Sequence, residues 1–308
     1  MNDEWQTISV RIGLYLSLML LFGAPFFGLV ALRPHERVSL TRGRMGGVLA
    51  STGLLGGVLS LFGMVVMARS MSGAEEYASI ERHVYEMLLL HTNVGLAWLV
   101  RMGALAAVVW AALYLARWPT LWLTITAACG GVALSSLAWS GHGAMDEGAR
   151  GLLHLSADIL HLLAAAAWLG SIAMFILLSA CTRVDDANRI ELLSRALNGF
   201  AMMGTLIVVT LAITGIINYW LINGWTFQAL TSTLYGTLFI CKFLAFLLML
   251  GVAGANRYLL SPRLEVARLR GDAADAVKAL QKSLTVELVA ATAILILIAW
   301  LGILSPLS

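Results

Sequence analysis

The sequence predicts an all-α fold, a polytopic membrane helix bundle with about eight transmembrane helices. Of its 308 residues, 60% are hydrophobic and only 12% are charged, a composition typical of integral membrane proteins. The apolar residues form runs of about 20, the length that a helix needs to cross a bilayer. These runs lack the ten-residue alternation of a β-barrel. We expect one integral membrane domain over residues 1–308, with spans at roughly 8–32, 44–69, 88–115, 120–140, 152–180, 196–222, 233–259 and 284–304.

The first run predicts a transmembrane helix that is retained, not a cleaved signal peptide. Asp3 and Glu4 precede it, where a signal peptide carries basic residues, and the run is longer than a signal core. Pro25 lies inside the run between Gly23 and Gly28. A proline in a helix interior removes a backbone hydrogen bond, so we expect a kink there.

The second run is rich in glycine. Gly43 and Gly47, and again Gly53 and Gly57, are four residues apart. Small residues at this spacing let membrane helices approach closely, so we expect this helix to pack tightly against another through these pairs.

The basic residues predict the orientation of the chain. Cytoplasmic loops of membrane proteins are enriched in Lys and Arg. The odd-numbered connections hold Arg33, Arg37, Arg42, Arg44, Arg117, Arg183, Arg189, Arg195, Arg257, Arg263, Arg268, Arg270, Lys278 and Lys282, and the even-numbered ones hold Arg69, Arg82 and Arg150. We therefore expect both termini to be periplasmic and the protein to be a multi-pass protein of a bacterial inner membrane.

Two external segments carry candidate metal ligands. His83, Met87 and His91 are spaced i, i+4, i+8, so they share a face if the third helix begins before the membrane. Imidazole and thioether together suit copper. An interfacial amphipathic turn is the alternative.

The fourth connection is the second such segment. It places His142 and Met145 between glycines, and Asp146 and Glu147 make it acidic, which would attract a cation. A plain surface turn is the alternative here.

The fifth run holds a polar ladder, His154, Asp158 and His161, at i, i+4 and i+7 on one helix face. Ionisable groups inside a membrane are expensive. Three interpretations stay open: the groups hold the bundle together, they form a metal path, or a histidine ligates a b-type haem. In the last case the second ligand must come from another helix, for example His91 paired with His154 or His161.

Other features exclude several classes of function. The three cysteines form no CxxC pair, and there is no CxxCH, no Walker A sequence and no Ser/His/Asp signature. We therefore expect neither an enzyme nor a nucleotide-driven pump, and the basic loops follow from topology without implying nucleic acid. Lys242 lies inside the seventh run, where an ion pair with Asp158 would offset its charge.

Three motifs resemble the CopD/PcoD family of bacterial copper-resistance membrane proteins. They are the SGHGAM turn that begins at Ser140, the H-x3-D-x2-H-x6-W-x-G pattern from His154 to Gly170, and the NRYLLSPRL segment from Asn256 to Leu264. The resemblance implies an inner-membrane protein of copper homeostasis. It implies copper transfer from periplasm to cytoplasm, with a separate periplasmic copper-binding protein of the CopC type as partner. It carries His142, His154 and His161 over as functional residues.

The leading hypothesis is a copper transporter or membrane chaperone whose partners are the copper ion, a CopC-like protein and the lipid bilayer. Copper, as Cu(I) or Cu(II), would be accepted at the external side and passed to the ladder. The candidate ligands are His83, Met87, His91, His142, Met145, His154, Asp158 and His161. A b-type haem electron-transfer protein is the alternative function, and a structural or sensory subunit without a transported substrate is the third.

Overall fold

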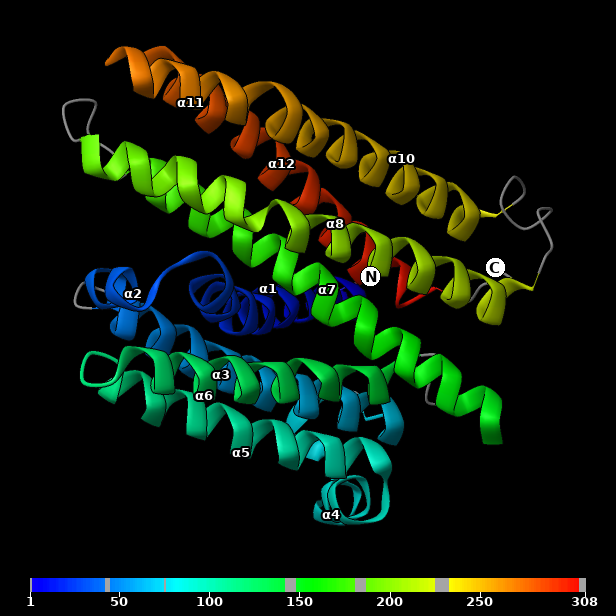
Figure 1. The fold of residues 1–308 in the computed structure, drawn as a ribbon. Coiled ribbons are helices and arrows are strands. Elements are labelled where there is room, and N and C mark those ends of the chain that lie inside the picture. The colour runs from blue at the N-terminus through cyan, green and yellow to red at the C-terminus, as the bar shows by residue number, and fades with distance from the viewer. Residues whose placement is uncertain are drawn as a thin grey trace.

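The computed structural model describes residues 2–41, 45–74, 76–141, 148–180, 187–224 and 233–304, and these residues are helical with no strand. Among them, eight helices are long and apolar enough to cross a membrane, which confirms the predicted number of spans. The spanning helices are α1 (Asn2–Ala31), α3 (Gly46–Ser72), α5 (Asn93–Tyr114), α6 (Pro119–Ser135), α7 (Gly148–Ala180), α8 (Ala187–Asn223), α10 (Leu234–Ala255) and α12 (Ala274–Leu301) (Figure 1).

Shorter helices connect the spans. They are α2 (Pro34–Leu40), the 3-10 helices η2 (Tyr77–Ser79) and η3 (Ser136–Ser140), α4 (Arg82–His91), the π-helix η5 (Asn256–Leu260) and α11 (Ser261–Arg270). The helices η5 and α11 continue directly from α10, so this arm of the bundle extends beyond the length that a bilayer requires.

The predicted start of the third span was wrong. Residues 88–91 belong to α4, and the spanning helix α5 begins only at Asn93. Thr92 separates them with an extended backbone (φ −126°, ψ 149°), and its hydroxyl accepts a hydrogen bond from the Gly95 amide at 3.0 Å. A threonine at this position satisfies an orphan amide of the new helix, so α4 and α5 are two helices.

Helix α1 lies between two groups of helices (Figure 1). On one side α3, α5 and α6 pack together, and on the other side are α7, α8, α10 and α12. Helix α1 packs against α3, α6, α7 and α12, and it continues through Pro25 without ending. The N-terminal helix therefore joins the two halves of the bundle.

Glycines permit the closest approaches of α1. A Cβ atom on Gly23 would lie 2.9 Å from the Gly170 Cα atom of α7, and one on Gly130 of α6 would lie 2.7 Å from the Leu21 carbonyl oxygen. Real Cβ atoms do not come so close to backbone, so side chains at these positions would push the helices apart.

Of the glycines predicted to pack in α3, one does so and two do not. Gly53 faces α5, since an added Cβ would lie 3.0 Å from a Val109 methyl group, but Gly47 and Gly57 have nothing within 4 Å. Gly43 lies outside the described residues. The contact with α5 repeats after seven residues, at Gly46 and Gly53. That is about two helical turns, and it leaves the other members of the predicted pairs facing outward.

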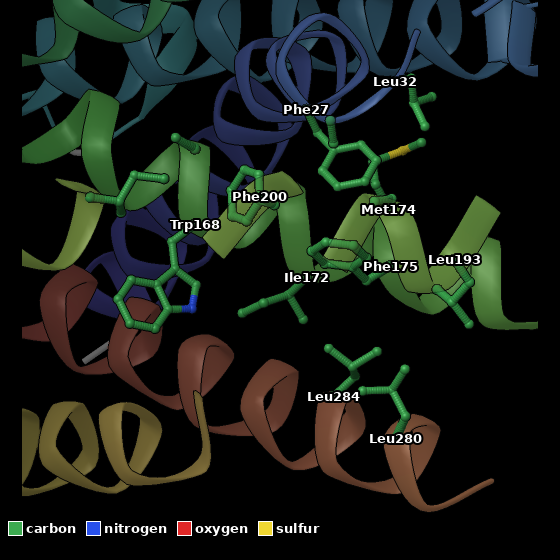
Figure 2. Packing of buried hydrophobic residues seen from close by; sticks show 14 of the residues in the cluster. Phe27, Leu32, Trp168, Ile172, Met174, Phe175, Leu193, Phe200, Leu280 and Leu284 are labelled. Carbon is green, nitrogen blue, oxygen red and sulfur yellow. The ribbon is translucent and has the colours of Figure 1, made fainter. Parts of the chain in front are cut away.

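A buried aromatic and aliphatic cluster fills the interior between α1, α7, α8 and α12 (Figure 2). Phe27 packs edge-on against Phe175, with ring centroids 4.8 Å apart, and Phe175 packs against Phe200 at 5.7 Å. Trp168 and Leu284 belong to the same cluster.

The ends of the bundle differ in chemistry. At one end, which we call the terminal end, Trp5 of α1 lies 6.3 Å from Trp300 of α12, and the Tyr77 hydroxyl donates to Gln6 at 2.6 Å. Helix α4 follows η2 at this end. At the opposite end, the arginine end, Arg195 pairs with Glu36 of α2.

Candidate metal site on helix α7

The predicted polar ladder lies in the half of α7 nearer the terminal end. His154 is 2% exposed, and Asp158 and His161 are partly buried. From His154 to His161 the helix rises about 10 Å, at 1.5 Å per residue. The ladder therefore begins near the start of α7 and reaches into the apolar part of the bundle.

Asp158 lies between α8 and the end of η3. Its Oδ1 atom accepts a hydrogen bond from the Asn218 side-chain amide of α8 at 2.7 Å. Its Oδ2 atom lies beside Gly141, where an added Cβ would be 3.6 Å away. The carboxyl group is thus held at the junction of three segments, and Gly141 comes directly before His142 in the chain.

His161 also turns toward α8. Its Nδ1 atom lies 2.8 Å from the Thr214 hydroxyl oxygen. That hydroxyl lies 2.6 Å from the Thr210 carbonyl oxygen, to which it donates its single proton. With the hydroxyl proton used in this way, the Thr214 oxygen accepts from His161, and this tautomer carries its proton on Nδ1 and a lone pair on Nε2. A neutral imidazole of this form is a metal ligand, and a hydrogen bond at its other nitrogen orients it.

Asn218 and Gly215 complete the α8 side of the site. The Asn218 side-chain oxygen is buried, and among the described residues it has no hydrogen-bond partner. Gly215 lies against the His161 ring, since an added Cβ would be 3.7 Å from Cε1. An amide oxygen that accepts no hydrogen bond can coordinate a cation. The site therefore offers both oxygen and nitrogen atoms to a metal ion.

Charged and phenolic groups from other helices surround the ladder. The Lys242 ammonium of α10 interacts electrostatically with Asp158 and with His161, and it lies 5.8 Å from the centre of the Phe239 ring. Tyr15 of α1 interacts electrostatically with Asp158 and with the buried Arg101. Electrostatic interactions thus join Lys242, Asp158, Tyr15 and Arg101 across four helices, and the ion pair of Lys242 with Asp158 stays a prediction.

The ladder does not form one three-ligand centre. Within the described part of the chain, no three His, Cys, Asp or Glu side chains lie close enough together to hold a metal ion. The helical rise explains this, because residues at i, i+4 and i+7 are spread along the axis. Asp158 and His161 face two neighbouring positions of α8, Asn218 and Thr214, one turn apart.

The second predicted cluster lies on α4, apart from α7. His83, Met87 and His91 are all exposed on this helix, and Met87 is 44% exposed. His83 Nδ1 lies 3.0 Å from a carboxylate oxygen of Glu81. The adjacent face of α4 is buried through Val84 and Leu88 against α3 and α5. The three side chains thus form an open surface cluster at the terminal end.

Two predicted ligands, His142 and Met145, lie outside the described residues. The haem alternative finds no support in the described part of the chain, because His91 is exposed on α4 whereas His154 is buried on α7.

Thr214, the residue that contacts and orients His161, is not among the site residues predicted from the sequence. A signal was present, because Thr210, Thr214 and Asn218 are spaced i, i+4, i+8 in the sixth apolar run. These positions share a helix face, and a polar face in a membrane helix predicts a polar partner.

Comparisons with known proteins give a consistent result. Residues 1–152 match the family described as "Copper resistance protein D-like, N-terminal domain", and residues 194–301 match "Copper resistance protein D". The chain is similar to "Copper resistance protein D" of Pseudomonas syringae pv. tomato, with 42% identity over 97% of this chain and 96% of that protein. It is also similar to "Inner membrane protein YebZ" of Escherichia coli (strain K12), with 29% identity over 57% of this chain and 58% of that protein. No solved structure matches the chain.

Proposed function

The chain belongs to the copper resistance protein D family, and from that premise we propose that it accepts copper at the terminal end of the bundle and moves it into or across the membrane. The observation that carries the proposal is the arrangement of His161. Its Nδ1 atom is held by Thr214, so Nε2 keeps the lone pair that copper requires. Imidazole binds copper in either oxidation state.

Asp158 and Asn218 give the site its charge and its oxygen atoms. A cation between helices is costly unless a negative charge offsets it. The Asp158 carboxylate lies one turn before His161 on α7, and the buried Asn218 oxygen lies beside it. The ion would therefore be held by few ligands at each step, and His154, Asp158 and His161 would act in succession.

The exposed cluster on α4 is proposed as the acceptor of incoming copper. Met87 supplies a soft sulfur and His83 and His91 supply imidazoles, all on the outer surface. Soft ligands favour Cu(I), and imidazole also accepts Cu(II). His142 and Met145 stay predicted ligands.

We infer the orientation from the charges. The arginine end carries Arg37, Arg195 and Arg268, so it would face the cytoplasm and the terminal end the periplasm of a bacterial inner membrane. A small periplasmic copper-binding protein of the CopC type would then meet α4. The proposed activity is transport, without an enzymatic step.

The test is copper content and copper uptake of the purified protein in vesicles. His154→Ala and His161→Ala should each reduce both, and His35→Ala is the matched control, because His35 is 75% exposed at the arginine end. Copper content and uptake that both substitutions leave unchanged would reject the site. An optical spectrum of the same sample tests the haem alternative, which requires a Soret band.

A further inference from the structure

A second ionisable group lies deep in the bundle, away from the histidines. Glu287 of α12 is 3% exposed, and Asn256, the first residue of η5, is 7% exposed. The Asn256 side-chain amide donates to Glu287 Oε2 at 2.9 Å. Glu287 is at the middle of the 28-residue helix α12, and Asn256 lies where α10 ends and η5 leads into α11.

No cation balances this carboxyl group among the described residues. Asn256 is the only side chain there with which Glu287 interacts electrostatically or by hydrogen bond. The charged and titratable groups of the elements packed against α12 interact with other residues. Lys242 of α10 interacts electrostatically with Asp158, and Tyr15 of α1 does so with Asp158 and Arg101. Arg257 of η5 donates to Ala201 and Thr205 of α8, and Arg268 of α11 pairs with Glu265 and Glu191. His161 of α7 contacts Thr214.

The surroundings of Glu287 are apolar. Leu284 and Ala290, one turn on either side of it, are buried in the same cluster as Trp168 and Ile172 of α7. Leu284 and Ile172 point toward one another in this interior (Figure 2). An ionised carboxylate placed there without a cation loses several kcal/mol of hydration free energy, so the charged form is strongly disfavoured.

The Asn256 side chain shows which form the site is built for. Its amide oxygen is buried and, within the described residues, has no hydrogen-bond partner. An ionised carboxylate has no proton to give it. A protonated carboxyl group does, since its O–H can donate to the amide oxygen while the amide N–H donates to the other carboxyl oxygen. The neutral acid and the amide then satisfy each other through two hydrogen bonds.

We propose that Glu287 and Asn256 form a proton-binding site where η5 contacts the middle of α12. The carboxyl group binds one proton, and the neutral acid then shares two hydrogen bonds with the Asn256 side chain. On release the O–H bond breaks, the electron pair stays on the carboxylate and the proton passes to water at the arginine end.

The position of Asn256 connects this site to the shape of the bundle. It opens a π-helical segment, η5, between α10 and α11, and such segments occur often at functional sites. The next residue, Arg257, donates to the Ala201 carbonyl oxygen of α8 at 2.9 Å. A charge that appears on Glu287 therefore acts beside η5, which contacts both α12 and α8.

A coupling between this proton site and copper movement follows if the proposed function holds, and it rests on that function. Copper that leaves the ladder must pass the apolar layer around Trp168 to reach the arginine end. Release of one proton from Glu287 as one Cu(I) ion arrives would leave the charge of the bundle unchanged. The proton site would then be the counterpart of the histidine ladder, and uptake would respond to a pH gradient.

Infrared difference spectroscopy on the protein in lipid nanodiscs tests the proton site without copper. Wild type at neutral pH should show the carbonyl band of a protonated carboxylic acid, and Glu287→Gln should remove it. Glu265→Gln is the control, because this carboxylate pairs with Arg268 near the surface and should leave the band in place. The proposal is overturned if wild type lacks the band or if Glu287→Gln retains it.

A second variant tests the proposal independently, in case Glu287→Gln does not fold. Asn256→Ala removes both hydrogen bonds to the carboxyl group, so the pH at which the wild-type band titrates should move in this variant. An unchanged titration would overturn the role of Asn256. In copper-loaded vesicles, Glu287→Gln should abolish the response of uptake to a pH gradient and leave the copper content unchanged. If instead the His154 and His161 substitutions prove silent, the proposed copper site fails while the infrared result stands.

Discussion

Gly23 of α1 and Gly170 of α7 meet backbone against backbone. An added Cβ on Gly170 would collide with Gly23 and lie 2.7 Å from the backbone nitrogen of Ala24. Gly170 is nine residues beyond His161 on the same helix. A contact this close restricts how α7 is rotated about its axis, and it therefore helps to hold His161 and Asp158 toward α8.

We therefore expect Gly170→Ala to destabilise the protein and to weaken copper binding, although residue 170 contacts no proposed ligand. The methyl group must displace the α1 backbone, and overpacking of this kind typically costs about 1–3 kcal/mol. Thermal unfolding in detergent measures the first effect and copper content the second. Gly57→Ala is the control, because nothing lies within 4 Å of that position. Equal stability of the two variants would contradict the close contact of α1 with α7 at Gly170.

The sequence predicted the number of spans because a bilayer demands about 20 apolar residues per helix. It could not predict the separation of α4 from α5, since the apolar run crosses Thr92 and only the cap at Gly95 reveals the break. It predicted the ladder on one face of α7. It did not predict that Thr214 would meet His161, because that depends on the rotation of two helices, which the contacts of the whole bundle set.

The hydroxyl of Thr214 should control copper affinity through His161. Thr214→Val keeps the shape of the side chain and removes the oxygen that accepts from Nδ1. The imidazole then loses the hydrogen bond that fixes its tautomer and orientation. Loss of such an orienting partner typically weakens metal binding about 10- to 100-fold, which isothermal titration with copper would measure.

Thr210→Val is the control for this variant. The Thr210 hydroxyl lies one turn earlier on α8 and donates to the Leu206 carbonyl oxygen of its own helix at 2.9 Å. Its removal should leave copper affinity unchanged. Wild-type affinity in Thr214→Val would show that His161 binds no copper through Nε2.

The exposed cluster on α4 should affect the capture of copper but not the stability of the protein. The combined variant His83→Ala/Met87→Ala/His91→Ala changes only exposed side chains, for which each substitution usually alters stability by less than about 0.5 kcal/mol. Uptake should fall at limiting copper and recover at saturating copper, because the transfer sites on α7 are intact. Initial uptake rates across a range of copper concentrations distinguish these effects.

Leu88→Ala provides the contrast on the same helix. Leu88 is 1% exposed and packs α4 against its neighbours, so its truncation should reduce stability by about 2–5 kcal/mol. If the triple variant behaves like Leu88→Ala, or takes up limiting copper as wild type does, α4 is a structural element only.

Lys242 should oppose copper binding, since its ammonium interacts electrostatically with both Asp158 and His161. A copper ion at His161 would meet a like charge, and two positive charges roughly 8–15 Å apart repel by on the order of 1–2 kcal/mol at an effective dielectric constant of about 20. We expect Lys242→Met, which keeps an unbranched side chain and removes the charge, to tighten copper binding by about tenfold. Lys282→Met is the control, because Lys282 is exposed on the part of α12 near the arginine end. Weaker binding in Lys242→Met would mean that the lysine supports the metal site by keeping Asp158 charged, and an unchanged affinity would place the bound copper away from His161.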